Sequence, residues 1–159
     1  MALIAYTDGS ALGNPGKGGY AVVLMETEMK LKKEIKRGFR NTTNNRMELM
    51  AVIAALEALK IIPSEITIYT DSKYVHDAVE KKWVFGWEKK GFKGKKNPDL
   101  WKQFLKSYRQ HKVTLQWVKG HAGDPLNERA DQLAVAAANS KNPEIDIGYE
   151  SQNHDLKLL

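Results

Sequence analysis

Residues 44–59 constrain the fold most, because apolar side chains recur there at helical spacing and surround most of the predicted helix. One face carries Met47, Met50, Ala51, Ala54, Ala55, Ala58 and Leu59, and the other carries Leu49, Val52, Ile53 and Leu56. Thr42 or Thr43 can cap its N-terminus, and Pro63 is expected to end the segment. A helix that is apolar on nearly all sides should be buried, so we expect a sheet that covers it.

Short apolar stretches before and after this helix predict that sheet. Strands are expected at residues 2–7, 20–27, 30–39, 65–70 and 113–118. Further helices are expected at residues 73–82, 83–90, 98–111 and 125–138. The first three strands read as an antiparallel meander. This order of elements predicts an α/β fold in which helices flank a mixed five-stranded sheet, although it does not fix the order of the strands.

The length of 159 residues predicts one domain. We assign residues 1–142 to it, including a basic protrusion at about residues 81–97, and expect the tail at residues 143–159 to be frayed because periodicity is lost there. The sequence has no apolar run long enough for a membrane span and no signal peptide pattern, which predicts a cytoplasmic protein. It has no cysteine, which excludes disulfides and thiolate metal sites.

The net charge of +6 is concentrated in residues 81–96, where seven lysines stand against the single acid Glu88. Such a basic segment favours a polyanionic partner. Trp83 and Trp87 are interleaved with these lysines and could give flat packing surfaces to a nucleic acid. The alternative is a solvated charged helix with its aromatic side chains in the core, which we expect for at least one of the two tryptophans.

The tripeptide Tyr-Thr-Asp occurs twice, ending at Asp8 and at Asp71, each time at the C-terminal end of a predicted strand. If the two strands are parallel and adjacent, both carboxylates emerge at one edge of the sheet. Either aspartate alone is more simply a turn former or a helix cap. However, Glu48 near the start of the apolar helix and Asp131 on the alanine-rich helix add two acids. Carboxylates from separate elements are the ligands that Mg²⁺ prefers.

Several segments occur in the order found in one enzyme family. They are Thr7-Asp8-Gly9-Ser10, Asn41 through Leu49 (NTTNNRMEL), Tyr69-Thr70-Asp71-Ser72, and Trp117 through Gly123 (WVKGHAG) followed by Asn127 through Asp131 (NERAD). These segments resemble the signature segments of bacterial type 1 ribonuclease H, and the resemblance runs over about residues 2–150. It implies a ribonuclease H-like fold and a monomeric endonuclease that hydrolyses the RNA strand of RNA–DNA hybrids.

The resemblance also implies the roles of individual residues. The family's catalytic carboxylates, which bind two Mg²⁺ ions or Mn²⁺ in their place, correspond to Asp8, Glu48, Asp71 and Asp131. The products should carry 5′-phosphate and 3′-hydroxyl ends. His121 corresponds to a catalytic histidine that assists proton transfer or product departure. The predicted substrate-binding residues are Asn14, Thr43 and Asn44 at a phosphate of the DNA strand, Trp83, Trp87, Lys89 and Lys90 in the basic protrusion, and Asn127 beside Asp131.

Two other functions are compatible with parts of this pattern. A catalytically inactive hybrid-binding module would share the basic segment, and an integrase-like nuclease would share the fold. The sequence also departs from the family pattern: Lys73 stands where many relatives carry Gln, Ala11 where some carry Cys, and Glu88 interrupts the basic stretch. These departures leave the detailed contacts with the grooves of the hybrid open.

Overall fold

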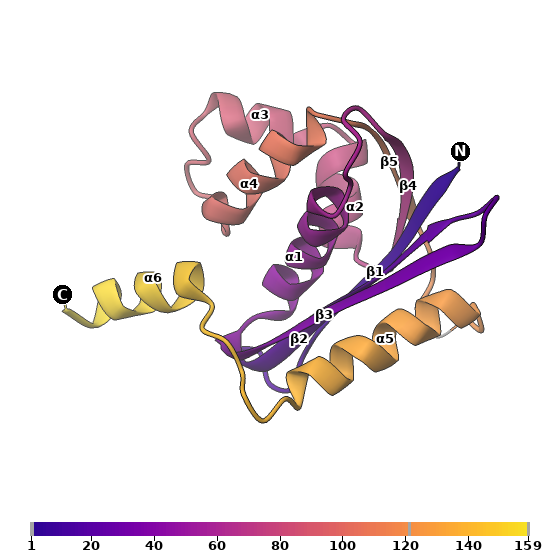
Figure 1. The fold of residues 1–159 in the computed structure, drawn as a ribbon. Coiled ribbons are helices and arrows are strands. Elements are labelled where there is room, and N and C mark those ends of the chain that lie inside the picture. The colour runs from indigo at the N-terminus through magenta and orange to yellow at the C-terminus, as the bar shows by residue number, and fades with distance from the viewer. Residues whose placement is uncertain (1, 121, 159) are drawn as a thin grey trace.

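The structure is a computed structural model that describes the backbone of residues 2–120 and 122–158, and the side chains of these residues up to residue 152. Figure 1 shows the elements along the chain. They are β1 (Leu3–Ala11), β2 (Gly16–Glu26), β3 (Leu31–Thr42), α1 (Asn44–Glu57), β4 (Glu65–Thr70), α2 (Lys73–Glu80), α3 (Trp83–Lys89), α4 (Pro98–Tyr108), β5 (Lys112–Trp117), α5 (Pro125–Ala138) and α6 (Ile147–Leu158).

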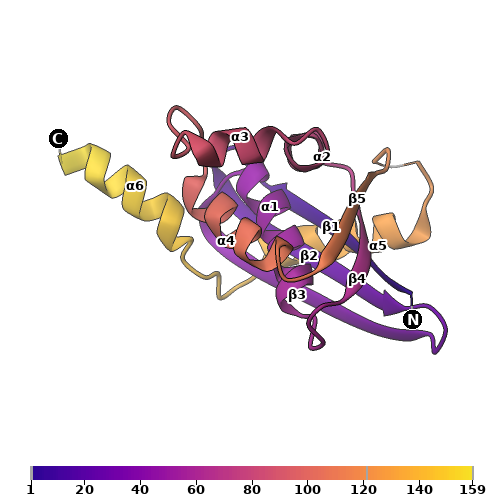
Figure 2. The same cartoon turned by 90° about the horizontal axis from the view of Figure 1, so that it is seen from above.

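The five strands form one mixed sheet in the order β3-β2-β1-β4-β5. The first three strands pair antiparallel, whereas β4 pairs parallel with both β1 and β5. The predicted meander and the α/β fold with a mixed sheet are therefore confirmed. Helices α1 and α2 cover one face of the sheet, with α4 packed against α1 and α3 against α2 on that side, and α5 covers the other face (Figures 1 and 2).

Helix α1 lies at the centre of the core, as its apolar circumference predicts. Thr43 caps its N-terminus by accepting a hydrogen bond from the backbone N–H of Arg46. Side chains from more than one side of the helix are buried, including Met47, Leu49 and Val52. Because the helix contacts the sheet and α4 at once, its register fixes the position of every polar residue that it carries.

Helix α5 packs unusually close to β2 and β3. A Cβ atom at Gly38 would overlap the backbone carbonyl of Ala137, and one at Gly19 would lie 2.5 Å from the carbonyl oxygen of Ala134. Alanine on the helix and glycine on the strands therefore let the two backbones approach each other. This close packing sets how far the residues on α5 reach toward β1.

The tail differs from the frayed segment that the sequence predicts. The backbone N–H of Glu144 donates to the carbonyl of Gly38, and its carbonyl accepts from the N–H of Arg40. Asp146 is buried, and α6 begins directly after it and extends away from the body of the protein (Figure 1). Periodicity within the tail does not report these contacts, because their partners lie on β3. No helix in the described residues has the length and apolarity to cross a membrane.

Candidate active site

Strands β1 and β4 bring the two Tyr-Thr-Asp phrases together. Tyr6 is paired with Tyr69 in the parallel register, and the two rings stack with their centroids 4.6 Å apart. Asp8 and Asp71 each follow two residues later, so the predicted adjacency of these carboxylates is confirmed. The predicted end of the first strand at residue 7 is wrong, because β1 continues to Ala11 through antiparallel pairing with β2. Asp8 therefore projects from within a strand.

Glu48 reaches this point from α1 because Gly9 lets the helix approach β1. A Cβ atom at Gly9 would overlap the backbone of Met47 and Glu48. The backbone N–H of Gly9 instead donates to Oε1 of Glu48 and to Oδ1 of Asp8, each at 2.9 Å. One carboxylate oxygen from each of Asp8, Glu48 and Asp71 lies within 4.8 Å of the others. Three of the four predicted metal ligands are thus held together.

The fourth acid, Asp131, comes from α5. That helix begins after Asp124, which caps it by accepting hydrogen bonds from Leu126 and Asn127 and also accepts one from the hydroxyl of Tyr6. Asp131 lies in the same hollow of about 470 Å³ as Asp8, Glu48 and Asp71, close enough to raise the pKa of Asp8. All four predicted carboxylates therefore converge on one open hollow.

The electrostatics of this hollow are those of an acidic cluster held out of water. Asp8 and Glu48 are only 4% and 8% exposed. Burial, followed by the charges of Glu48 and Asp71, raises the pKa of Asp8 far above its usual value. Burial also raises the pKa of Glu48, although hydrogen bonds from Asp8 and Gly9 oppose the shift. Close carboxylates repel one another unless a cation or a proton separates them.

Two buried side-chain oxygens have no hydrogen-bond partner among the described residues: Oε2 of Glu48, which lines the hollow, and Oδ1 of Asn127 on α5. Asn127 lies one helical turn before Asp131. A buried polar atom without a partner is costly, so such atoms call for a ligand. Clustered carboxylate oxygens and an unpartnered glutamate oxygen suit a hard divalent cation such as Mg²⁺. The residues present therefore fit a magnesium site.

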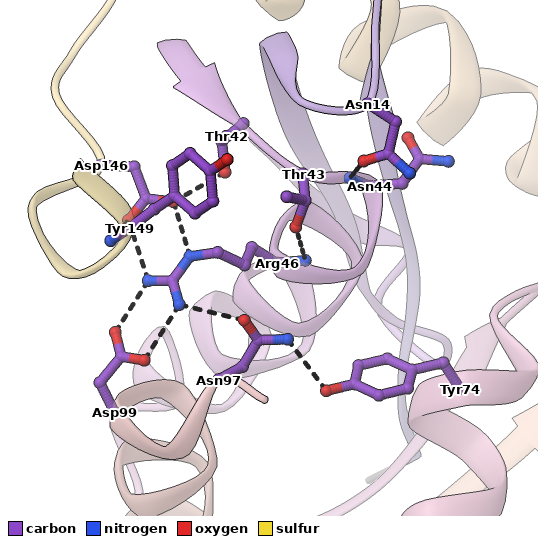
Figure 3. Close-up of polar contacts among 10 residues, drawn as sticks. All are labelled: Asn14, Thr42, Thr43, Asn44, Arg46, Tyr74, Asn97, Asp99, Asp146 and Tyr149. Carbon is purple, nitrogen blue, oxygen red and sulfur yellow. Dashed lines mark hydrogen bonds and ion pairs between the residues drawn. The ribbon is translucent and has the colours of Figure 1, made fainter. Parts of the chain in front are cut away.

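The three residues predicted to hold a phosphate lie together (Figure 3), and one of them, Asn44, lines the carboxylate hollow. Oδ1 of Asn14 accepts from the backbone N–H of Asn44 at 3.1 Å, and Oδ1 of Asn44 accepts from that of Ala11 at 2.7 Å. Thr43 caps α1. The structural roles of turn maker and helix cap are thus present in these residues. Asn14 is joined to the carboxylate hollow through the backbone of Asn44.

The basic segment divides into packed and exposed residues. Trp87 is half-buried and meets Trp101 edge to face at 5.8 Å, as expected for a core aromatic. Trp83 is 49% exposed, and Lys89 and Lys90 are exposed as well. The carboxylate of Glu88 forms its ion pair with Arg109, the residue directly after α4, rather than with a lysine of the basic segment.

His121 lies outside the described residues. Its neighbour Gly120 passes directly against the site, since a Cβ atom there would lie 2.9 Å from Oδ2 of Asp71. Lys73, which departs from the family pattern, lines the carboxylate hollow and places its ammonium group 4.9 Å from the centre of the Trp117 ring.

Sequence reasoning missed a buried ionic network around Arg46, which is 1% exposed. Its Nε donates to Oδ2 of Asp146 and its Nη2 to Oδ2 of Asp99, both at 2.8 Å (Figure 3). Although burial opposes the charge, these partners hold the pKa of Arg46 above its usual value. The hydroxyl of Thr42 also donates to Asp146. A charged residue inside the apolar helix was the available signal, but Asp146 lies too far along the chain for any local pattern to identify it.

Comparison with known proteins decides the family. The family model described as RNase H matches residues 1–139. The chain belongs to the ribonuclease H family. A ribonuclease H of Desulforamulus reducens is 51% identical over 147 residues, which are 89% of this chain and 91% of that protein. A ribonuclease H of Rhizobium etli is 54% identical over 134 residues, which are 81% of this chain and 86% of that protein.

Solved structures of ribonucleases H share the fold. LC9-RNase H1, described as a type 1 RNase H with the type 2 active-site motif, matches with a TM-score of 0.80 and 33% identity over 95% of this chain and 80% of its own. LC11-RNase H1, solved in complex with an RNA/DNA hybrid, matches with a TM-score of 0.64 and 27% identity over 86% of this chain and 96% of its own. The predicted resemblance to bacterial type 1 ribonuclease H is confirmed.

Proposed function

We propose that this ribonuclease H cuts the RNA strand of RNA–DNA hybrids with two divalent metal ions, leaving 5′-phosphate and 3′-hydroxyl ends. The observation that carries the proposal is the convergence of four carboxylates, two of them buried, beside a cluster of amide groups suited to a phosphate. The metal ligands would be Asp8, Glu48, Asp71 and Asp131. Mg²⁺ is the proposed ion, with Mn²⁺ able to replace it.

Each group of side chains has a separate task in this proposal. Asp8 and Glu48, fixed by the N–H of Gly9, would hold the cations beside the scissile phosphate. Asn14, Thr43 and Asn44 hold a phosphate of the DNA strand, which positions the RNA strand over the carboxylates. Bound Mg²⁺ would supply the Lewis acidity that activates the attacking water and neutralises charge at the leaving oxygen. The exposed lysines and Trp83 add attraction for the hybrid that does not depend on its base sequence.

Two alternative functions fit the site less well. A module that only binds hybrids would gain nothing from clustered buried carboxylates, because these repel a polyanion. An integrase-like nuclease would share the acidic site, but the phosphate-binding asparagines and the basic segment match the ribonuclease H pattern. All four acids come from one chain, so the site needs no second subunit. We propose a cytoplasmic monomer on this basis and on the sequence features described above.

Cleavage of three duplexes tests the proposal. With Mg²⁺, the protein is expected to cut the RNA of a labelled RNA–DNA hybrid at many sequences, because backbone contacts dominate, and to leave duplex DNA and duplex RNA intact. Chelator should stop the reaction and Mn²⁺ should restore it. Binding without cutting would support the binding module, and cutting of duplex DNA would support the integrase-like alternative.

Replacement of His121 by alanine should slow turnover by roughly 10²–10⁴-fold and leave measurable activity. A side chain that assists proton transfer contributes that much, whereas the carboxylates and their cations retain the main electrostatic effect. Single-turnover cleavage of the hybrid measures the change. A loss as complete as that of a carboxylate variant would make His121 indispensable.

A further inference from the structure

A second hollow lies beside the carboxylate site and has the opposite chemistry. This groove, of about 590 Å³, is walled by Asn14 and Thr43, by Lys95 and Lys96 of the loop before α4, and by Tyr149 and Gln152 of α6. None of its lining residues is acidic. Asn45 lines both hollows, so the groove continues directly from the carboxylate site.

We propose that α6 is part of the surface that binds the DNA strand, with Tyr149 and Gln152 contacting its sugar-phosphate backbone beyond the phosphate held at Asn14 and Thr43. This inference rests on the proposed function, which places that phosphate at one wall of the groove. A strand that continues from there runs between the two lysines and α6.

The chemistry of the lining suits such a strand. The ammonium groups of Lys95 and Lys96 attract phosphates without reading sequence. The ring of Tyr149 offers a flat face to a sugar, and its hydroxyl can donate to a phosphate oxygen. The amide of Gln152, which is exposed, provides another donor. The groove thus offers hydrogen-bond donors and positive charges, which are the groups that bind a polyanion.

The first turn of α6 is held firmly enough to position these groups. The N–H of Tyr149 donates to Oδ1 of Asp146, the acid that pairs with Arg46. Arg46 in turn donates its own N–H to Thr43, so one buried arginine joins the phosphate site to the start of α6. In Figure 3 the hydroxyl end of Tyr149 points from the Asp146 side toward Thr42 and Thr43.

A second ion pair acts outside the groove. The carboxylate of Glu150 accepts hydrogen bonds from Nε and Nη2 of Arg40, the shortest at 2.9 and 2.8 Å. Together with the Asp146 anchor, this pair fixes the rotation of the helix, so Tyr149 and Gln152 face the groove while Glu150 faces β3. The rest of α6 extends away from the body, as expected of an arm placed along a long ligand rather than of a core helix (Figure 2).

Binding measurements test the proposal. Anisotropy of a labelled RNA–DNA hybrid should show about fivefold weaker binding for Gln152→Ala, the loss expected for one hydrogen bond, and a larger loss for Tyr149→Ala. Lys95→Ala should lower the slope of log affinity against log salt by about one phosphate contact. Ser151→Ala on the same helix and Lys102→Ala on α4 are matched controls outside the groove, and both should bind like the wild type.

Two further readouts separate a contact with DNA from a structural effect. Tyr149→Ala should raise KM for the hybrid and leave kcat unchanged, and Tyr149→Phe, which keeps the ring, should lose only part of the affinity. A neutral methylphosphonate at one DNA position should weaken binding of the wild type but weaken binding of Tyr149→Ala no further. The same linkage on the RNA strand should show no such coupling with Tyr149.

The outcomes distinguish failure of this inference from failure of the proposed function. If the wild type cuts hybrids but the Tyr149 and Gln152 variants bind and cut as it does, α6 is not part of the substrate surface. Coupling of Tyr149 to the RNA strand alone would also overturn the inference. If the wild type neither binds nor cuts hybrids, the proposed function itself is wrong.

Discussion

Asp8→Asn is expected to abolish cleavage and, in the presence of chelator, to raise the melting temperature. Loss of a metal ligand should reduce cleavage on the order of 10³-fold or more, because the cations supply several kcal/mol of transition-state stabilisation. Without cations, burial and the neighbouring acids disfavour the charged form of Asp8, so folding at pH 7 requires this carboxyl group to take up a proton, which costs free energy. The amide is neutral at every pH and removes this cost, and each kcal/mol recovered should raise the melting temperature by roughly 2–4 °C.

The pH dependence of this gain has a defined sign. The pKa of Asp8 is raised in the folded protein, so above the unfolded value of about 4 the folded state retains a proton that the unfolded state has lost. Stability therefore falls as pH rises above that value. The melting temperature of Asp8→Asn should exceed that of the wild type at pH 7, and the difference should shrink as pH falls toward 4.

A matched control is Glu65→Gln, which neutralises an exposed acid at the start of β4. It should leave cleavage and melting temperature unchanged. Added Mg²⁺ should raise the melting temperature of the wild type more than that of Asp8→Asn, because a ligand stabilises the state that binds it. If Asp8→Asn instead melts clearly lower in chelator, Asp8 is a satisfied structural acid and the magnesium site is misassigned.

The second large effect is expected at the tail. Asp146→Ala should lower the free energy of unfolding by about 3 kcal/mol, because it leaves the buried guanidinium of Arg46 with only one carboxylate partner, Asp99. That loss corresponds to a melting temperature lower by roughly 6–12 °C. Urea unfolding followed by circular dichroism measures it.

Glu150→Ala provides the comparison on the same segment. It removes the ion pair with Arg40, whose side chain is 55% exposed, so solvent screens the interaction and the loss should be much smaller. Equal losses for Glu150→Ala and Asp146→Ala would show that burial of Arg46 does not determine the stability of the tail.

The sequence could predict those parts of the fold that local pattern encodes. The apolar residues of α1 required a covering sheet, and the repeated Tyr-Thr-Asp pointed to two parallel neighbours whose register then placed Asp8 beside Asp71. The strand order and the extension of β1 to Ala11 could not be predicted, because they depend on hydrogen bonds with β2. The contacts of the tail could not be predicted for the same reason, because its hydrogen-bond partners on β3 lie about a hundred residues earlier in the chain.

The candidate site shows a similar division. Its acids could be identified because four carboxylates in family-like segments form an improbable set. Glu48 lies close to Asp8 because Gly9 has no Cβ atom and lets α1 approach β1. The motif contains this glycine but does not show which helix packs against it. The role of Trp87 depends on tertiary packing, since a tryptophan among lysines can face either a ligand or the core. Its edge-to-face contact with Trp101 places it against the core.

The four acids of the site come from β1, α1, the connection after β4 and α5, and the last of them along the chain is Asp131 on α5. During synthesis on the ribosome, a chain that stops before α5 already contains Asp8, Glu48 and Asp71 but leaves one face of the sheet bare. The arrival of α5 closes the core and completes the acidic hollow in the same event. Copies of the chain that end before α5 should therefore be unable to cut nucleic acid, although they contain the basic segment.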